Sequence, residues 1–309
     1  MTARMIHINE NGKSVLQRQQ YSLKNEAIYS FDRAHLNMLL LDRAALHDNI
    51  NIAFEHKLVN VTISDEQVSL LFNVDGSLQT CVFANRQHTA LLVGCDGMHS
   101  ATRQAIAPIS RMDTSEDYIS TEYIELHIPP AKGTNQWAID NSCLHIWPKH
   151  EYMLIALPNA DGSFTSTLFG PHEMYEQFTD PATAAAFFRS NFPDALAVMN
   201  EEDVVAHLTT RRPNALGFAR CRPMNCGGRA VLLGDAAHAM VPFYGQGLNC
   251  GFEDVRIFIE QLDASLAKHG SSTALAHALP EYSATRQADV AAIQRLALDN
   301  YVEMRSKGA

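Results

Sequence analysis

The stretch of sequence that decides the fold is RAVLLGDAAHAMVPFYGQGLNCGFED, residues 229–254. Its apolar run at 231–233 ends at Gly234, which predicts a buried strand that delivers Asp235 to the carboxyl edge of a sheet. From about Leu248 the apolar residues recur at helical spacing, so a helix is expected to start beside that aspartate. Ligands of open α/β sheets bind at this edge, which makes the stretch the first candidate for a binding site.

The turn and the helix start in this stretch suit a planar or anionic ligand. The start of a helix presents unpaired N–H groups and a partial positive charge, and Gly245 and Gly247 leave room for a ligand against the backbone. The carboxylate of Asp235 can accept hydrogen bonds from the hydroxyl groups of a ribose or a ribityl chain. A plain crossover from strand to helix, with glycines only for its turns, explains the same residues equally well.

A second strand followed by an aspartate lies earlier in the chain. Residues 90–97, ALLVGCDG, predict a buried strand that ends near Asp96, and Ser100 is expected to cap a helix over 101–106. Because this pattern mirrors residues 231–235, we expect the two aspartates to converge on one ligand. A local turn stabilised by the side chain of Asp96 is the simpler alternative.

Composition excludes several classes of protein. A chain of 309 residues with 46% hydrophobic and 19% charged residues fits one large globular domain or two interleaved ones. The net charge of −10 argues against a nucleic-acid partner. No apolar run is long enough for a membrane segment, and the first residues lack the pattern of a signal peptide. The six cysteines and 14 histidines lack the spacing of metal ligands, so we expect reduced thiols and no metal.

The rest of the chain predicts antiparallel strands mixed with helices. Strands are expected at 3–8, 14–16, 52–54, 59–63, 68–72, 80–83, 123–128, 143–147, 152–157 and 164–169, the first two joined by a turn at 11–12. An amphipathic helix capped by Ser30 or Asp32 is expected to run to about Leu46. Further helices are expected at 181–189, at 194–199, and beyond Asp254 with breaks near Gly270 and Pro280. The last helix carries Ile293, Leu296, Asn300 and Glu303 on one face. Either its end emerges into solvent, or the two polar residues form a corner of a ligand pocket.

Over nearly its whole length the chain resembles the kynurenine 3-monooxygenase family of FAD-dependent aromatic hydroxylases. The segments that carry the resemblance are ARMIH (3–7), VGCDG (93–97), LHIWP (144–148), IALPN (155–159), SFT (163–165), LLGDAAH (232–238) with GQG (245–247), and NYVEM (300–304). The resemblance implies an α/β (α+β) fold of the p-hydroxybenzoate hydroxylase type, without its amino-terminal GxGxxG unit and with an antiparallel-sheet substrate domain. The implied domains are an incomplete FAD-binding domain at 1–116 and 223–280, a substrate-side sheet at 117–222, and a pocket-lining helix at 281–309.

The resemblance also assigns ligands and residue roles. L-Kynurenine would be bound by Arg4 and Tyr21 at its carboxylate and by Asn300 and Glu303 in the rest of the pocket. FAD would be bound by Arg33, Leu58, Asp96, Asp235, Pro242, Gly247, Leu248 and Asn249, with Phe243 also near its ring. NADPH would reduce the flavin, and O2 would form a C4a-hydroperoxyflavin that hydroxylates kynurenine to 3-hydroxykynurenine, a step of tryptophan catabolism toward NAD. No catalytic side chain is expected, and His238 is assigned to the structural Gly-Asp motif.

The chain departs from the family at both ends. It has no GxGxxG turn, no pocket tyrosine beyond Asn300 and no helical tail, so we expect an internal fragment. Two alternatives stay open: another flavin aromatic hydroxylase, or a catalytically silent fragment unable to hold FAD. Full-length eukaryotic members lie on the outer mitochondrial membrane, whereas a bacterial protein or this fragment alone would be cytoplasmic. A homodimer also stays open.

Overall fold

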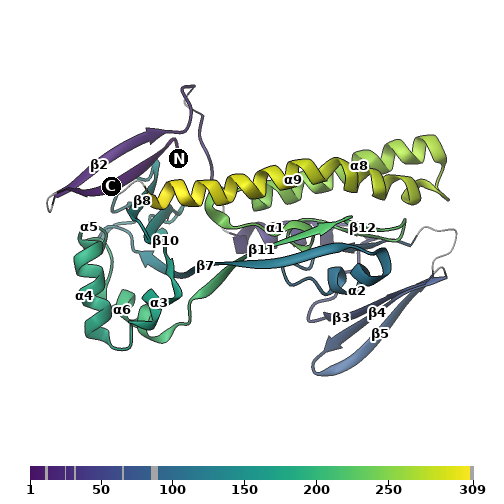
Figure 1. Ribbon diagram of the computed structural model, residues 1–309, viewed down its shortest axis with the longest axis horizontal. Coiled ribbons are helices and arrows are strands. Elements are labelled where there is room, and N and C mark those ends of the chain that lie inside the picture. Colours follow the sequence, from purple (N-terminus) through teal and green to yellow (C-terminus); the bar gives the residue numbers. More distant parts are fainter. Residues whose placement is uncertain (11–12, 25, 31–32, 65, 85–89, 307–309) are drawn as a thin grey trace. The chain divides into compact units, whose positions relative to one another are not determined.

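The computed structural model describes residues 1–10, 13–24, 26–30, 33–64, 66–84 and 90–306 (Figure 1). The chain divides into two compact units. Unit 1 comprises Met1–Asn51, Ile119–Leu216 and Val302–Ala309, and unit 2 comprises Ile52–Tyr118 and Gly217–Tyr301. Residues 1–51 therefore group with the central sheet rather than with the Gly-Asp segments, because their first strand pairs with a strand of that sheet.

Unit 1 is built on a seven-stranded sheet, two strands of which, β7 and β11, continue into unit 2. The strand order is β11 (Asn214–Arg222), β7 (Asp113–Ile128), β10 (Phe164–Pro171), β9 (Tyr152–Pro158), β8 (Cys143–Lys149), β1 (Ala3–Glu10) and β2 (Lys13–Gln20). The predicted hairpin is confirmed as β1 and β2, and it joins the sheet through parallel pairing of β1 with β8. Its turn at 11–12 lies outside the described residues.

Helices α1 (Arg33–Ala45), α3 (His172–Glu176), α4 (Pro181–Asn191), α5 (Pro193–Leu196) and α6 (Glu201–Thr210) complete unit 1. Helix α4 begins where the sequence supplies a cap, since Asp180 accepts a hydrogen bond from Thr183 N at 2.9 Å and proline follows it. Apolar side chains from the sheet, including Leu154 and Leu168, pack with Phe188 and other residues of the helices in one buried cluster. Every side chain of β8, β9 and β10 is buried or half-buried, so both faces of these strands are largely covered.

A chain of hydrogen bonds ties β1, β8 and α5 together in the interior of unit 1. His7 Nδ1 lies 2.8 Å from Asp194 Oδ2, and His7 Nε2 lies 2.9 Å from His145 Nδ1. His145 Nε2 contacts the carbonyl oxygen of Asp140 at 2.7 Å, and Trp147 Nε1 donates to Asp194 Oδ2 at 2.9 Å. Burial lowers the pKa of His145 to about 4, so this ring is neutral at physiological pH.

Unit 2 contains two three-stranded sheets. One has the order β12 (Asn225–Cys226), β13 (Ala230–Leu232) and β6 (Leu92–Gly94), and the other has the order β3 (Lys57–Ile63), β4 (Gln67–Val74) and β5 (Ser77–Ala84). Its helices are α2 (Ala101–Ser110), α7 (Asp235–His238), the 3-10 turn η2 (Pro242–Tyr244), α8 (Gly247–His269) and α9 (Ala274–Ser306), whose last residues belong to unit 1. The two predicted Gly-Asp strands are thus confirmed, and the structure shows that they pair in parallel, with Leu232 opposite Gly94.

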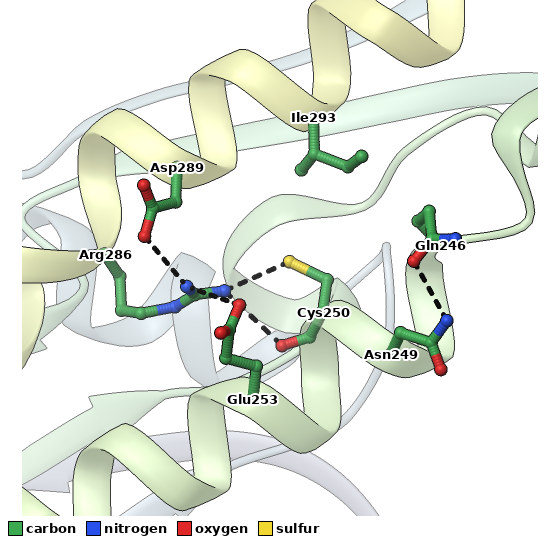
Figure 2. A pocket seen from close by; sticks show the side chains of 7 residues that line it. All are labelled: Gln246, Asn249, Cys250, Glu253, Arg286, Asp289 and Ile293. Atoms are coloured by element: carbon green, nitrogen blue, oxygen red, sulfur yellow. Dashed lines mark hydrogen bonds and ion pairs between the residues drawn. The ribbon is translucent and has the colours of Figure 1, made fainter. Parts of the chain in front are cut away.

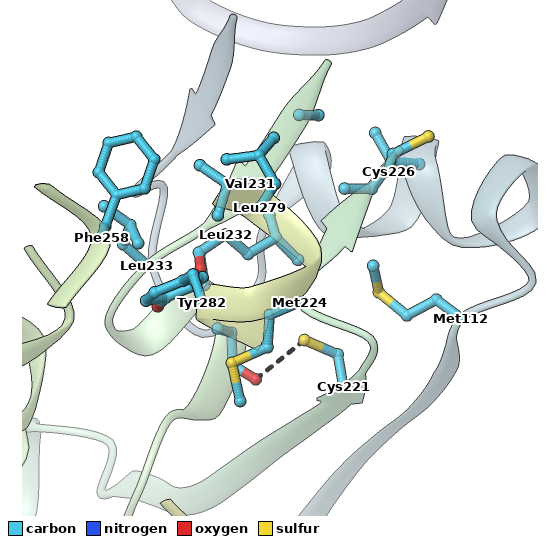
Figure 3. Close-up of a cluster of buried hydrophobic side chains, with 14 of the residues drawn as sticks. Met112, Cys221, Met224, Cys226, Val231, Leu232, Leu233, Phe258, Leu279 and Tyr282 are labelled. Atoms are coloured by element: carbon cyan, nitrogen blue, oxygen red, sulfur yellow. Dashed lines mark hydrogen bonds between the residues drawn. The ribbon is translucent and has the colours of Figure 1, made fainter. Parts of the chain in front are cut away.

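The apolar run at 231–233 forms the centre of the core of unit 2 (Figure 3). Val231 and Leu232 are fully buried, and Phe258 of α8 and Tyr282 of α9 pack against the same cluster. The described residues include no helix that is long and apolar enough to cross a membrane.

Three sequence predictions about these elements were wrong or incomplete. Residues 52–54 form no strand. Pro280 does not break α9, which continues through it from Ala274 to Ser306, and the side chains of Leu279 and Tyr282 on either side of it are buried. Helix α1 begins at Arg33 as expected, but none of its residues is buried. Of its two predicted caps, Asp32 lies outside the described residues and Ser30 instead donates to Pro158 O at 3.2 Å.

We predict that unit 1 loses stability on the acid side of neutrality because of His145. Its pKa is about 4 in the folded chain and near 6.5 when unfolded, so between these values the unfolded state binds the additional proton. The free energy of unfolding should fall by about 2.5 kcal/mol between pH 7 and pH 4.5 from this group alone. Urea titrations followed by fluorescence report on unit 1, since both tryptophans, Trp137 and Trp147, belong to it.

The matched variants are His145→Gln, which should flatten this pH dependence, and His127→Gln, an exposed histidine of the same unit, which should leave it intact. Equal slopes in His145→Gln and the parent chain would contradict the assignment.

Candidate functional site

The carboxyl ends of β6 and β13 share one edge of the sheet of unit 2, and both motif aspartates follow them. Asp96 comes two residues after Gly94, and Asp235 three residues after Leu232, which is the partner of that glycine in the ladder. Both aspartates are exposed. The structure therefore brings the two predicted residues to one edge, as parallel strands require.

The carboxylate of Asp96 organises the start of α2. Its Oδ1 accepts from Ser100 Oγ at 2.5 Å, and its Oδ2 accepts from Thr102 N and Oγ1 at 2.9 and 3.0 Å. Ser100 in turn accepts from Arg103 N at 2.9 Å, so its predicted capping role is confirmed. The local turn stabilised by aspartate, which the sequence left open, is present.

A buried arginine that the sequence analysis missed fastens the two motif loops together. The guanidinium of Arg103 is 1% exposed, and it donates to Ala236 O at 2.6 Å and to Met98 O at 2.5 Å. It also pairs with Glu116. One donor set thus binds the loop after β6 and the turn after β13, and the planar guanidinium suits such several-fold contacts.

The backbone conformation of Gly234 explains one of the glycines in the motif. Gly234 has φ +58° and ψ −142°, a conformation that residues with a side chain rarely adopt. A Cβ on Gly251 of α8 would lie 3.6 Å from the Cα of Gly234, so the helix passes close to the turn. The turn then leads directly into α7, with Asp235 as its first residue.

Below this turn lies a buried network centred on Asp254 of α8. Asp254 Oδ2 accepts from Gly234 N at 2.8 Å and lies 2.6 Å from His238 Nε2, and Oδ1 accepts from Arg286 Nε at 2.8 Å. Asp254 and Arg286 are 0% exposed and His238 is 1% exposed. Although burial opposes both changes, the hydrogen bond to Asp254 raises the pKa of His238 to about 9, and the bonds from His238, Gly234 and Arg286 lower the pKa of Asp254.

The amino end of α8 supplies the next part of the site. The helix begins at Gly247, and the side chain of Gln246, its cap residue, makes no capping hydrogen bond. Leu248 and Asn249 in the first turn are exposed, and Asn249 Nδ2 donates to Gln246 Oε1 at 2.9 Å. A helix start of this kind attracts negative charge or a polarised ring edge.

The predicted pocket residue Asn300 lies against the turn that carries Pro242. Asn300 is 6% exposed and donates through Nδ2 to Phe243 O, while Tyr301 stacks on the Phe243 ring with centroids 4.3 Å apart. The polar residue at this point of α9 is therefore buried and bonded to the turn, and its helix has not yet emerged into solvent there.

Two predicted substrate residues meet in unit 1. The Arg4 guanidinium carbon lies 5.7 Å from the centroid of the Tyr21 ring, at the foot of the β1–β2 hairpin. The Tyr21 hydroxyl is buried and has no hydrogen-bond partner among the described residues. Burial raises the pKa of Tyr21, against the opposing charge of Arg4. A buried donor of this kind fits a ligand acceptor beside a cation.

The remaining predicted residues are less informative. Arg33 is exposed and lies 3.9 Å from Glu125, a pair of little energetic weight. Leu58 lies at a bulge of β3, where the register shifts between Leu58 and Asn60. Glu303 is exposed near the end of α9.

One group of buried side chains has the donor atoms of a metal site. The ligand atoms of His238, Cys250 and Asp254 lie within 4.8 Å of one another. Both carboxylate oxygens of Asp254 are already occupied by protein donors, and Arg286 NH2 lies 3.2 Å from the Cys250 sulfur. Two positive groups at this position disfavour a cation, and the group is better described as an ion-pair network.

We predict that Asp254→Asn destabilises the chain by about 3–5 kcal/mol, because it leaves two buried cationic groups without their shared counter-charge. Asp263→Asn, which alters an exposed aspartate on the same helix, should change the free energy of unfolding by less than about 0.5 kcal/mol. Urea unfolding followed by far-UV circular dichroism measures both. Similar losses in the two variants would show that burial of the network contributes nothing.

We also predict an alkaline limit to the stability of unit 2. The pKa of His238 is about 9 in the folded chain against 6.5 in the unfolded chain. Its contribution is therefore fully present below pH 6.5 and is lost as the pH rises through 9. Between pH 7 and pH 9.5 this group alone should cost about 2 kcal/mol, and His238→Gln should lack that slope. An unchanged slope in the variant would remove His238 as its source.

Comparison of the chain with known proteins identifies its family. A family model described as an FAD binding domain matches residues 2–297. The kynurenine 3-monooxygenase of Candida albicans is 42% identical over 308 residues, which cover 99% of this chain and 64% of that protein. The Anopheles gambiae enzyme of the same name is 40% identical, over 99% of this chain and 60% of its own length. The Saccharomyces cerevisiae one is 42% identical, over 98% and 65%. The chain thus spans between 60% and 65% of these three relatives.

Solved structures agree on the fold. A 2-methyl-3-hydroxypyridine-5-carboxylic acid oxygenase has a TM-score of 0.67 at 18% identity, covering 98% of this chain and 74% of its own. A HpxO variant from Klebsiella pneumoniae, solved in complex with FAD, has a TM-score of 0.65 at 18% identity, covering 99% and 74%. The expected α/β fold of the p-hydroxybenzoate hydroxylase type is confirmed, and the chain belongs to the FAD binding domain family.

Proposed function

We propose that the protein is a flavin-dependent monooxygenase that hydroxylates the aromatic ring of L-kynurenine. The observation that carries the proposal is the sheet edge in unit 2 where the parallel strands β6 and β13 end. Asp96 and Asp235 follow these strands, and the start of α8, which has no side-chain cap, comes after Asp235 in the chain. The names of the relatives supply the reaction class. A second candidate is a protein that binds flavin at this edge but has no oxygenase activity.

The residues present fit a flavin nucleotide in three respects. Asp235 is exposed at a strand end, where its carboxylate can accept hydrogen bonds from ribityl or ribose hydroxyl groups. Gly247 and the first-turn N–H groups of α8 can stabilise negative charge on the ring system, with Leu248 and Asn249 beside it. Pro242 lies in the turn that precedes this helix. Arg33, Leu58 and Asp96 complete the proposed contacts, and bound FAD would supply the activation of O2.

Substrate recognition is assigned to Arg4 and Tyr21. A guanidinium can hold an amino-acid carboxylate through two parallel hydrogen bonds, and a neutral phenol adds a third donor. The buried Tyr21 hydroxyl, for which the described residues provide no acceptor, supports this assignment. We propose that Asn300 and Glu303 complete the pocket, and that Glu303 meets the amine of the substrate.

The remaining components follow from the reaction class. A monooxygenase transfers one oxygen atom of O2 to the substrate and reduces the other to water, which consumes two electrons from a donor. We propose NADPH as that donor. The protein contributes binding, orientation and exclusion of water, and no side chain is assigned as a general acid or base.

The test of the proposal is a binding titration with FAD, followed by NADPH oxidation with and without L-kynurenine. Asp235→Ala should weaken FAD binding at least tenfold, since it removes hydrogen bonds to a charged acceptor. Kynurenine-stimulated NADPH oxidation supports the oxygenase, whereas FAD binding without such stimulation supports the second candidate. No FAD binding by the parent chain would reject both.

We predict that Tyr21→Phe separates binding from stability. Loss of a buried hydroxyl without a protein acceptor should leave the free energy of unfolding unchanged or raise it by up to about 1 kcal/mol. Loss of one hydrogen bond to the kynurenine carboxylate should raise its dissociation constant about tenfold. Tyr29→Phe, which alters an exposed tyrosine of the same unit, should change neither. A kynurenine dissociation constant that stays within twofold of the parent would remove Tyr21 from the site.

A further inference from the structure

Three side chains of the buried network have the order of a nucleophile, an imidazole and a carboxylate. Cys250 Sγ lies 4.0 Å from His238 Nδ1, and His238 Nε2 lies 2.6 Å from Asp254 Oδ2. Enzymes that use a cysteine as a nucleophile place these groups in the same spatial order: the carboxylate orients the imidazole ring, and the ring faces the sulfur. Nothing in the proposed flavin chemistry uses this group of side chains.

A fourth side chain adds positive charge at the sulfur. Arg286 NH2 donates to Cys250 Sγ at 3.2 Å and to Cys250 O at 3.5 Å, while its Nε is bound to Asp254. With His238 protonated, the fully buried part of the network holds two cations and one carboxylate. A thiolate at Cys250 would make these buried charges equal in number, which low dielectric surroundings favour.

The sulfur is also reachable. Cys250 is 7% exposed, and it lines a cavity of about 310 Å³ between α8 and α9 (Figure 2). The other residues that line this cavity are Gln246, Asn249, Glu253, Arg286, Asp289 and Ile293. A cavity of this volume admits water and molecules of similar size.

The remaining buried thiols of the chain lie in different surroundings. Burial raises the pKa values of Cys143, Cys221 and Cys226, that of Cys221 to about 12. These thiols stay protonated at neutral pH and are poor nucleophiles. They are therefore expected to react with peroxide more slowly than Cys250.

We propose that Cys250 is a site of oxidation by hydrogen peroxide, with Arg286 and His238 holding its thiolate. The sulfur attacks one peroxide oxygen, so that an S–O bond forms as the O–O bond breaks. The sulfur is oxidised by two electrons to a sulfenic acid, and the second oxygen leaves as hydroxide, which takes a proton from His238 Nδ1 to become water. The sulfenic acid is uncharged, and Asp254, which bonds to His238, also accepts a hydrogen bond from Gly234 N. Oxidation of Cys250 therefore changes the charges in the network that holds the Gly-Asp turn.

The test is labelling with dimedone during exposure to an equimolar amount of hydrogen peroxide at pH 7. Dimedone adds to sulfenic acid and not to methionine sulfoxide, so oxidation of Met240 does not interfere. Trypsin leaves Cys250 as the only cysteine in peptide 230–256, Cys95 alone in 87–103 and Cys81 alone in the peptide that ends at Arg86. The label should accumulate on 230–256 at least threefold faster than on either other peptide, and Cys250→Ser should abolish it there.

A pair of double variants tests the role of charge without removing buried groups. Arg286 NH1 pairs with Glu253 and Asp289, whose side chains are 46% and 67% exposed. Glu253→Gln with Asp289→Asn should leave the guanidinium more attractive to the thiolate and speed labelling at least threefold. The control is Glu260→Gln with Asp263→Asn, which removes two exposed negative charges from α8 at positions not paired with Arg286.

Two results would overturn the proposal. One is slower labelling of peptide 230–256 than of the Cys95 or Cys81 peptide in the parent chain. The other is labelling rates that agree within twofold between the two double variants.

Discussion

The buried carboxylate of Asp254 is the interaction on which the arrangement of unit 2 depends. It accepts hydrogen bonds from the backbone of Gly234, from His238 and from Arg286, and so joins the Gly-Asp turn to α8 and α9. An ionised carboxylate without exposure to water is costly unless its lone pairs are used, and here three donors use them. The position of the Gly-Asp turn is therefore fixed by buried groups of the protein, which need no contact with a ligand.

Arg103 is a second buried charged residue that bonds to the Gly-Asp turn. Its guanidinium binds carbonyl oxygens in the loops that follow β6 and β13, and so holds two segments far apart in sequence in one geometry. Buried cations and carboxylates thus form the scaffold, while Asp96 and Asp235 stay exposed at the strand ends. The buried groups thus preorganise the strand ends at which we propose that a flavin binds.

Unit 1 also contains a buried hydrogen-bond network beside its proposed binding residues. The β1–β2 hairpin carries Arg4 and Tyr21, and the hydrogen-bond chain through His7 and His145 fixes that hairpin to the rest of the unit. The Tyr21 hydroxyl, in contrast, has no acceptor among the described residues. A buried hydroxyl without an acceptor supports the proposed role of Tyr21 in binding a ligand.

Sequence alone determined the elements whose signals are local. Strand-like runs predicted most strands of the central sheet, Ser100 predicted the start of α2, and the two Gly-Asp runs predicted two strands that bring their aspartates together. Tertiary structure decided the rest. Arg103, Asp254 and Arg286 read as ordinary charged residues, because each has a partner that is distant in sequence: Arg103 binds Ala236, 133 positions away, and Arg286 binds Asp254, 32 positions away. Phe252, Val255 and Ile259 form an apolar stripe on α8 that is nevertheless exposed, whereas the opposite face, with Asp254, is buried. Periodicity shows that a helix has two faces, but only the packed neighbours determine which face they cover and which charges they can neutralise.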